Sequence, residues 1–324
     1  MYSWNNIKIS VEGDKKIFID GIKKYINAVY VHDYEGKCDI KATVCSSSQN
    51  GIPTLPADAH KVKSLVYNLD IEIRLDVYSY NTQLWYLYRD TAGIWLDYEK
   101  NELAVCLSDM PLNFEYANIQ LFFLHPLGSL LENFGYFRLN CSCGTLGTRA
   151  ILFAGQHGSG KTTSAFTLPT HGGTIVSEDL TFINKDEEGY HPSSLTKLVG
   201  LNLATVNNFF PELNQVHSAA FSDNVIYYFL EDINTTRQED TSISVITLLN
   251  KTGKRTTGCS PSQSGEIMPL LFPSGIHSNI EANTGAKFVF IADMLDEIYK
   301  CKFFSGTDMS DFVKHIATII NLSN

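Results

Sequence analysis

Residues 155–162 have the composition and spacing of a phosphate-binding loop. They read GQHGSGKT after the apolar run 150–154, which fits the Walker A pattern, GxxxxGK followed by Ser or Thr, at every fixed position. Glycines let the backbone approach phosphate oxygens and adopt positive φ, so that successive amides point toward the anion. The Lys161 ammonium can neutralise phosphate oxygens, and the Thr162 hydroxyl can ligate Mg²⁺. The pattern predicts a P-loop that binds ATP or GTP with Mg²⁺. The residues expected to bind the nucleotide are Gly155, Gly158, Ser159, Gly160, Lys161, Thr162 and Thr163.

Two adjacent acidic residues, Glu178 and Asp179, follow the apolar segment 173–176. If this segment is a strand beside the P-loop strand, its C-terminal end faces the phosphates. One carboxylate could then ligate Mg²⁺, and the other could accept the proton of an attacking hydroxyl. The alternative is a solvated acidic turn without a chemical role.

Two sequence blocks resemble the catalytic domain of HPr kinase/phosphorylase, a family related to the phosphoenolpyruvate carboxykinase P-loop fold. Residues 150–163 read AILFAGQHGSGKTT, and residues 171–179 read HGGTIVSED. A branch of kinase-like proteins found in peptide-modification pathways looks closer, because its members also carry a β-rich N-terminal region. The resemblance covers about residues 120 to 310 and is most specific at the P-loop.

The resemblance implies an α/β fold, in which a P-loop domain of the HPr kinase/phosphoenolpyruvate carboxykinase type follows a β-rich N-terminal domain. By position, Lys161 and Thr162 would bind phosphate and metal. Asp179 would be the metal-side carboxylate, and Glu178 would be the general base. The implied reaction transfers the γ-phosphoryl group of ATP to a serine or similar hydroxyl of a peptide or protein. Related kinases assemble as oligomers, so a homo-oligomer is implied by analogy.

Two positions depart from the family pattern. The family ends the second block with two aspartates, whereas the longer Glu178 places its carboxylate about 1 Å further out, a displacement that can cost orders of magnitude in rate. The family also has a histidine in the strand before the P-loop, where this chain has Asn140. An amide forms hydrogen bonds but does not exchange protons near neutral pH. Both departures bear on phosphoryl transfer more than on nucleotide binding.

Other residues near these motifs carry weaker chemical signals. Arg237 could reach a transferred phosphate from a loop or a neighbouring subunit, although a surface position is the simpler interpretation. His157 lies at a variable position of the P-loop and is expected to face solvent, and His171 is expected in a turn. The aromatic run 227–229 is typical of a hydrophobic core.

The elements expected around these motifs divide the chain into two parts. Short alternating segments separated by polar turns predict an antiparallel meander in the first part. Residues 119–134 are expected to form an apolar helix that links the parts. We therefore expect a β-rich domain over residues 1–134 and a nucleotide-binding domain over residues 135–324. The strands expected in the two parts are 71–77, 84–88, 94–98, 103–107, 150–154, 173–176, 225–230 and 243–249, with a hairpin around 185–189 and helices at 161–168 and 309–322.

Net charge, targeting segments and cysteine usage indicate which binding partners and which cellular compartment to expect for this chain. The chain has 324 residues and a formal net charge of −10, which disfavours binding to nucleic acid or to an anionic membrane. The sequence shows no signal peptide and no apolar stretch near the roughly 20 residues of a spanning helix, so a cytoplasmic protein is expected. The 7 cysteines are scattered without a CxxC pair and are expected to be reduced, with Cys141 and Cys143 as buried structural thiols.

Three classes of function remain open at this point. The first is the Mg²⁺-dependent kinase described above. The second is a nucleotide-binding regulatory or interaction module, in which Asn140 and Glu178 mark impaired phosphoryl transfer and the β-rich part recognises a partner. The third is carboxykinase-like chemistry on a small dicarboxylate, for which the sequence shows no convincing set of basic residues.

Overall fold

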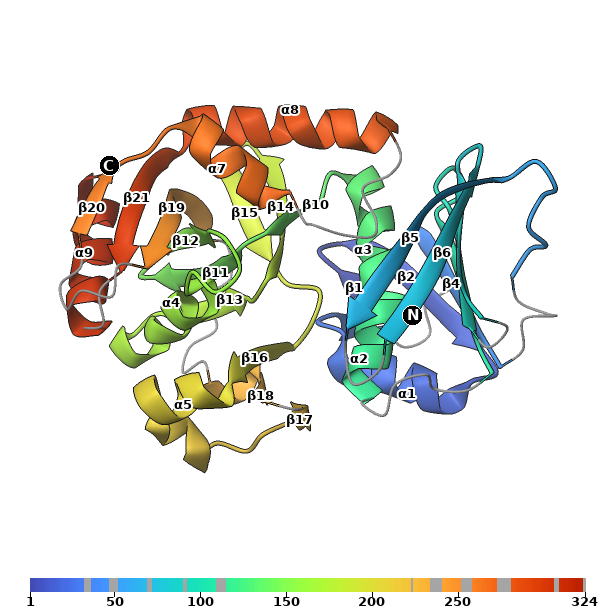
Figure 1. The fold of residues 1–324 in the computed structure, drawn as a ribbon, viewed down its shortest axis with the longest axis horizontal. Helices are drawn as coiled ribbons and strands as arrows, with labels where there is room; N and C mark the ends of the chain where they lie inside the picture. The colour runs from blue at the N-terminus through green and yellow to red at the C-terminus, as the bar shows by residue number, and fades with distance from the viewer. Residues whose placement is uncertain are drawn as a thin grey trace. The chain divides into compact units, whose positions relative to one another are not determined.

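The computed structural model describes most of the chain, and Figure 1 shows its helices and strands. The described residues are 1–31, 36–46, 52–68, 72–89, 92–108, 115–222, 224–233, 241–251, 258–272, 281–305 and 309–322. The fold is mixed α/β and contains several sheets. It divides into two compact units, one holding the described residues up to Phe134 and the other those from Gly135 onward. Within the described ranges, no helix combines the length and apolar character that crossing a membrane requires.

The N-terminal unit is built on a 9-stranded sheet with the order β3-β1-β2-β4-β9-β8-β7-β6-β5. The pairs β2–β4 and β4–β9 are parallel, and the other neighbours are antiparallel. The antiparallel meander expected from the sequence is confirmed in β6 to β9. The strands are β1 (Tyr2–Trp4), β2 (Ile7–Gly13), β3 (Val29–Tyr30), β4 (Ile40–Cys45), β5 (His60–Asn68), β6 (Glu72–Tyr80), β7 (Gln83–Tyr88), β8 (Ala92–Asp97) and β9 (Glu102–Leu107).

The helix expected over residues 119–134 is confirmed, and it begins earlier than expected. It consists of α2 (Glu115–Ile119), a π-helical segment (Gln120–Leu124), α3 (His125–Leu131) and a 3₁₀ turn (Glu132–Phe134). Its side chains Phe122, Phe123, Leu127 and Leu130 are fully buried. Helix α1 (Lys16–Tyr25) lies against α2, where the Glu115 carboxylate and Ile119 approach Gly21 closely.

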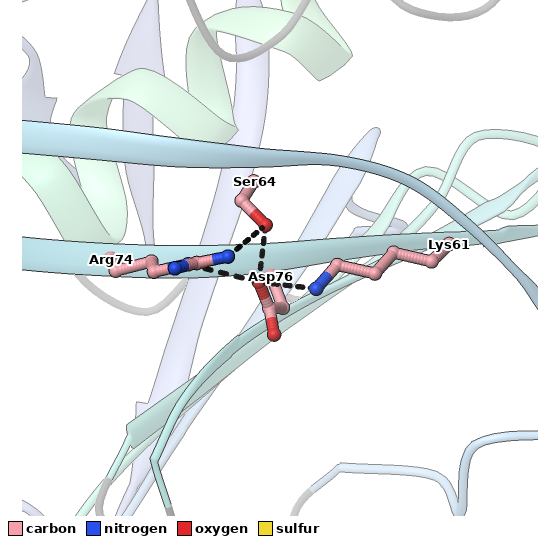
Figure 2. Close-up of polar contacts among 4 residues, drawn as sticks. All are labelled: Lys61, Ser64, Arg74 and Asp76. Atoms are coloured by element: carbon pink, nitrogen blue, oxygen red, sulfur yellow. Dashed lines mark hydrogen bonds and ion pairs between the residues drawn. The ribbon is translucent and has the colours of Figure 1, made fainter.

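Strand β5 ends the order of this sheet and carries a polar cluster with β6 (Figure 2). The Asp76 carboxylate accepts a 2.6 Å hydrogen bond from Ser64 and pairs with Lys61 at 2.8 Å and with Arg74 at 3.7 Å. The hydrogen bond from Lys61 and that from Ser64 lower the pKa of Asp76. A register shift near Lys61 and Lys63 adds a bulge to the same strand. Charges and bulges of this kind discourage an edge strand from pairing with another chain.

The second unit is built on a 6-stranded sheet with the order β13-β11-β12-β19-β21-β20. Strands β12, β19 and β21 are parallel to one another, and β11 runs antiparallel to both β12 and β13. These strands, followed by those of the two small sheets, are β11 (Ser142–Leu146), β12 (Arg149–Ala154), β13 (Thr174–Ser177), β19 (Ser242–Lys251), β20 (Gly258–Pro261), β21 (Tyr299–Ser305), β10 (Phe137–Asn140), β14 (Leu180–Asp186), β15 (Gly189–Ser193), β16 (Leu198–Asn202), β17 (Ala220–Ser222) and β18 (Val225–Phe229).

The 6-stranded sheet is covered on both faces, which explains why residues 150–154 are all apolar. Ile151 and Phe153 belong to one core cluster, with Phe166 of the helix after the P-loop, whereas Leu152 belongs to a second cluster, with Leu295. In Figure 1, α7 and α8 lie above the sheet and α4 lies below it. The helices are α4 (Lys161–Thr167), α5 (Leu203–Phe209), α6 (Leu230–Ile233), α7 (Ser264–Leu271), α8 (Glu281–Glu297) and α9 (Met309–Leu322).

Two small sheets complete this unit. One has the order β10-β14-β15 and contains the hairpin expected around residues 185–189, which is confirmed. The other has the order β16-β18-β17. Each contributes residues to the surroundings of Glu178 and Asp179.

Candidate functional site

The loop at residues 155–160 leaves the end of β12 and leads directly into α4. Gly160, at the N-cap of α4, has a left-handed backbone with φ of 98°. A Cβ atom on Gly155 would lie 2.4 Å from Ser159 Oγ and 3.0 Å from Ser159 Cβ. The Ser159 side chain therefore occupies the space that a side chain at position 155 would need. The strand–loop–helix order expected from the sequence is therefore present.

The Lys161 side chain lies within this loop. Only 8% of the residue is exposed, and its ammonium donates to the carbonyl oxygens of Gly155 (3.1 Å) and Gln156 (3.4 Å). The buried hydroxyl of Ser159 has no hydrogen-bond partner among the residues that the structure describes. The loop thus holds one ammonium and an unsatisfied hydroxyl at the start of a helix, where an anion is favoured.

Glu178 links the P-loop helix to two other parts of the unit. Its Oε1 accepts a 3.4 Å hydrogen bond from the Thr162 hydroxyl, and its Oε2 accepts a 2.5 Å hydrogen bond from the backbone N–H of Gly200 on β16. The strand before Glu178 does not lie beside the P-loop strand, because β11 lies between β13 and β12. Since β11 is antiparallel to both, β13 and β12 run in the same direction. The Thr162 side chain on α4 makes the contact with Glu178 at the end of β13.

Asp179 occupies the centre of a tight turn. Its φ is 57°, and the Leu180 N–H donates to the Glu178 carbonyl at 2.6 Å, which closes a three-residue turn. A turn of this kind with positive φ at its centre is rare and strained, and such strain clusters at functional sites. The turn leaves Asp179 exposed while Glu178 contacts Thr162 and Gly200.

The surroundings of Glu178 favour its protonated form. Burial raises its pKa to about 8, and the neighbouring Asp179 charge adds to the increase. The hydrogen bonds from Gly200 and Thr162, and the Lys161 charge, act in the opposite direction. The carboxyl is therefore poised to hold a proton near neutral pH and to lose it when positive charge accumulates nearby.

Tyr227 is a neighbour of this carboxylate pair that the sequence interpretation placed in the core. It lies opposite Gly200 in the β16–β18 pair, and a Cβ atom on Gly200 would be 2.8 Å from the Tyr227 ring. Burial, followed by the charges of Glu178 and Asp179, raises the Tyr227 pKa to about 12. No local pattern could have identified Tyr227, because only the pairing with Gly200 brings it to Glu178.

Strand pairing brings Asn140 near the carboxylates, but its side chain is hydrogen-bonded elsewhere. It pairs with Leu180 in the β10–β14 ladder, one residue from Asp179. Its side-chain Nδ2 donates to the Leu270 carbonyl of α7 at 3.2 Å. This bond holds the amide against α7, and among the described residues no hydrogen bond joins it to Lys161, Glu178 or Asp179.

The remaining candidates lie as follows. Thr163 is on the first turn of α4, and its carbonyl accepts a 2.9 Å hydrogen bond from Thr167. His157 is exposed, and His171 bonds to Thr170 in a turn. Arg237 lies outside the described residues. Cys141 and Cys143 are fully buried thiols.

The oxygen ligands present suit Mg²⁺ bound together with a nucleotide. Thr162 and Asp179 offer a hydroxyl and a carboxylate, which are hard donors, and Mg²⁺ in nucleotide sites takes its other ligands from phosphates and water. Across the described ranges, no group of three or more His, Cys, Asp and Glu side chains is arranged to hold a metal ion. The residues therefore fit a metal that arrives with a triphosphate rather than a metal held by the protein alone.

We expect Gly155→Ala to destabilise the chain by about 1–3 kcal/mol, because the new Cβ meets Ser159 and, at 3.2 Å, the Leu249 carbonyl oxygen. Gly158→Ala is the matched control, since it also places alanine at positive φ but meets no atom within 4 Å. Thermal unfolding of both variants checks the prediction. Equal midpoints for the two variants would show that the close approach at Gly155 is not required.

No model of a known protein family matches the chain, and no curated protein matches it in a sequence search. The assignment of a function therefore depends on the geometry of the P-loop, Glu178 and Asp179.

Proposed function

We propose that this chain is an ATP-dependent, HPr kinase-like phosphotransferase with the α/β fold of the HPr kinase/phosphoenolpyruvate carboxykinase type. It transfers the γ-phosphoryl group to a serine or similar hydroxyl of a peptide or protein. The observation that carries the proposal is the hydrogen bond between Thr162 and Glu178, because it joins the phosphate-binding loop to the acidic pair. A solvated acidic turn would have no reason to contact the P-loop helix.

Each group has a role that follows from its place. The loop amides and Lys161 would bind the phosphates, and Thr162 and Asp179 would hold Mg²⁺. The metal, when bound, neutralises charge on the β- and γ-phosphate oxygens. Glu178 accepts the proton of the attacking hydroxyl, and the Gly200 N–H keeps its carboxylate oriented. Positioning and charge stabilisation supply most of the catalysis in reactions of this class.

A second candidate is a nucleotide-binding regulatory module with impaired transfer. The observation that favours it is the bond between Asn140 and Leu270, which commits the amide to a structural contact where the resembling family has a histidine. In this case the nucleotide still binds, and no phosphorylated acceptor forms.

Two measurements on the full chain separate these functions. Calorimetric titration with MgATP and MgGTP measures binding, and intact-mass analysis after incubation with MgATP and serine-containing peptides detects a gain of about 80 Da per phosphoryl group. A kinase gives heat and the mass gain, whereas a regulatory module gives heat alone. Absence of binding to both nucleotides would eliminate both functions.

A further inference from the structure

Cys45 and Cys106 are direct neighbours in the N-terminal sheet. Cys45 is the last residue of β4 and pairs with Cys106 of β9 in a parallel ladder. Adjacent strands are about 4.8 Å apart. That spacing lies within the range of about 4.4–6.8 Å between Cα atoms that a disulfide accepts. The backbone therefore already has the separation that a disulfide between these two residues needs.

The two thiols also contact each other. Partner residues of a parallel ladder have side chains on the same face, and a hydrogen bond links the two sulfur atoms. Cys106 in turn pairs with Gly93 on β8, which offers no side chain there, and Ile52 lies over that glycine. Cys45 is therefore a direct neighbour of the Cys106 side chain on this face.

We propose that Cys45 and Cys106 form a reversible disulfide by exchange with a small-molecule disulfide. The Cys45 thiolate attacks one sulfur of the small disulfide, and the first small thiolate leaves and takes up a proton. The Cys106 thiol then loses its proton and attacks the Cys45 sulfur of the mixed disulfide, which releases the second small thiol. Two protein thiols are oxidised while one small disulfide is reduced to two thiols, so no other oxidant takes part.

The order of attack follows from the unequal surroundings of the two thiols. Cys45 is 7% exposed and Cys106 is 1% exposed, so Cys45 meets the reagent first. The hydrogen bond with Cys106 favours the thiolate of Cys45, whereas burial and the bond to Cys45 raise the pKa of Cys106 to about 12. Burial also raises the pKa of Cys45, so the first step is slow at neutral pH and faster in mild alkali.

The link would stabilise a particular junction of the sheet. The β4–β9 pair joins the strands β1 to β4 to the meander of β5 to β9. A covalent bond there closes a long segment of chain and restricts the unfolded state. We expect the melting temperature of the oxidised chain to rise by on the order of 5 °C or more.

The test is to incubate the full chain with oxidised glutathione at mildly alkaline pH, denature it in acid, alkylate the remaining thiols and map the peptides without reduction. We expect a linked peptide pair containing Cys45 and Cys106, loss of the link with a reductant, and the higher melting temperature. If both residues are alkylated while the exposed Cys259 has acquired glutathione, the proposal is overturned. A link that forms only in denaturant also overturns it.

Alanine variants test which cysteine attacks the small disulfide and which one resolves the mixed disulfide. Cys106→Ala should leave Cys45 as a persistent mixed disulfide with glutathione, and Cys45→Ala should leave Cys106 unmodified. Cys259→Ala is the matched control and should form the same link as the unaltered chain. If an alanine variant at Cys45 or Cys106 fails to fold, the peptide map of the unaltered chain decides the question by itself.

Discussion

Lys161→Ala is expected to lower the affinity for MgATP by about 100-fold or more. The Lys161 ammonium is nearly buried in the P-loop, and hydrogen bonds between charged groups contribute roughly 1.5–3 kcal/mol each. Loss of about 2.7 kcal/mol corresponds to a 100-fold loss of affinity. Calorimetric titration at fixed salt concentration measures the effect.

A surface lysine of the same unit provides the matched control for this change. Lys185 pairs with Glu297 at 2.6 Å and is well exposed, so Lys185→Ala makes the same change in net charge away from the loop. It should leave the affinity within about threefold, because exposed ion pairs contribute little. If Lys161→Ala binds MgATP as tightly as Lys185→Ala does, the P-loop assignment is wrong.

Glu178→Gln is expected to abolish most phosphoryl transfer while leaving the affinity for MgATP within several-fold. Removal of a general base commonly costs about 10²–10⁴ in rate. The amide keeps the size of the side chain and can still accept from the Gly200 N–H. Turnover by intact mass and affinity by calorimetry are measured on the same preparation. Unchanged turnover would remove Glu178 from the role of base.

The same substitution has a second consequence that needs neither nucleotide nor acceptor. The pKa of Glu178 is raised from 4.5 to about 8 in the folded chain, so between these values the folded state binds a proton that the unfolded state has lost. Stability should therefore fall as pH rises from about 5 to about 8, and level off above the folded pKa. The glutamine variant lacks this titration.

The measurement is the melting temperature of both chains from pH 5 to pH 9 in the presence of a chelator. Relative to Glu178→Gln, the unaltered chain should lose stability as the pH rises. The difference in the free energy of unfolding, calculated from the melting temperatures, should reach on the order of a few kcal/mol. Glu187→Gln, a change at an exposed glutamate, should follow the unaltered chain. Parallel profiles for all three chains would show that Glu178 is ionised throughout.

Sequence patterns located the local elements of the site because each has a local cause. The glycines, Lys161 and Thr162 form a motif whose conformation depends on adjacent residues, and the alternation in residues 71–107 follows the period of a strand. Helix α9 was evident from its apolar face, which buries Phe312 and Ile316. Helix α8 was not identified, since its exposed face carries Phe288 and Val289 and its buried face carries Lys287.

The connections between elements depended on pairing that no local pattern reveals. The insertion of β11 between β12 and β13, and the approach of Gly200 to Glu178, join residues that are distant in the chain. The sequence placed both acidic residues at a strand end. It could not distinguish the inward contacts of Glu178 from the exposure of Asp179, because neither the position of Gly200 beside Glu178 nor the positive φ of Asp179 is evident from the local sequence.

The positive φ of Asp179 means that this residue must satisfy a backbone requirement as well as supply a charge. Among side chains other than glycine, aspartate and asparagine tolerate a left-handed backbone best, so an alanine here would alter the local chain path as well as the charge. Any loss of activity in such a variant would mix the two causes. Asparagine keeps the shape and removes only the charge, and it is the replacement from which the electrostatic contribution of this carboxylate can be read separately.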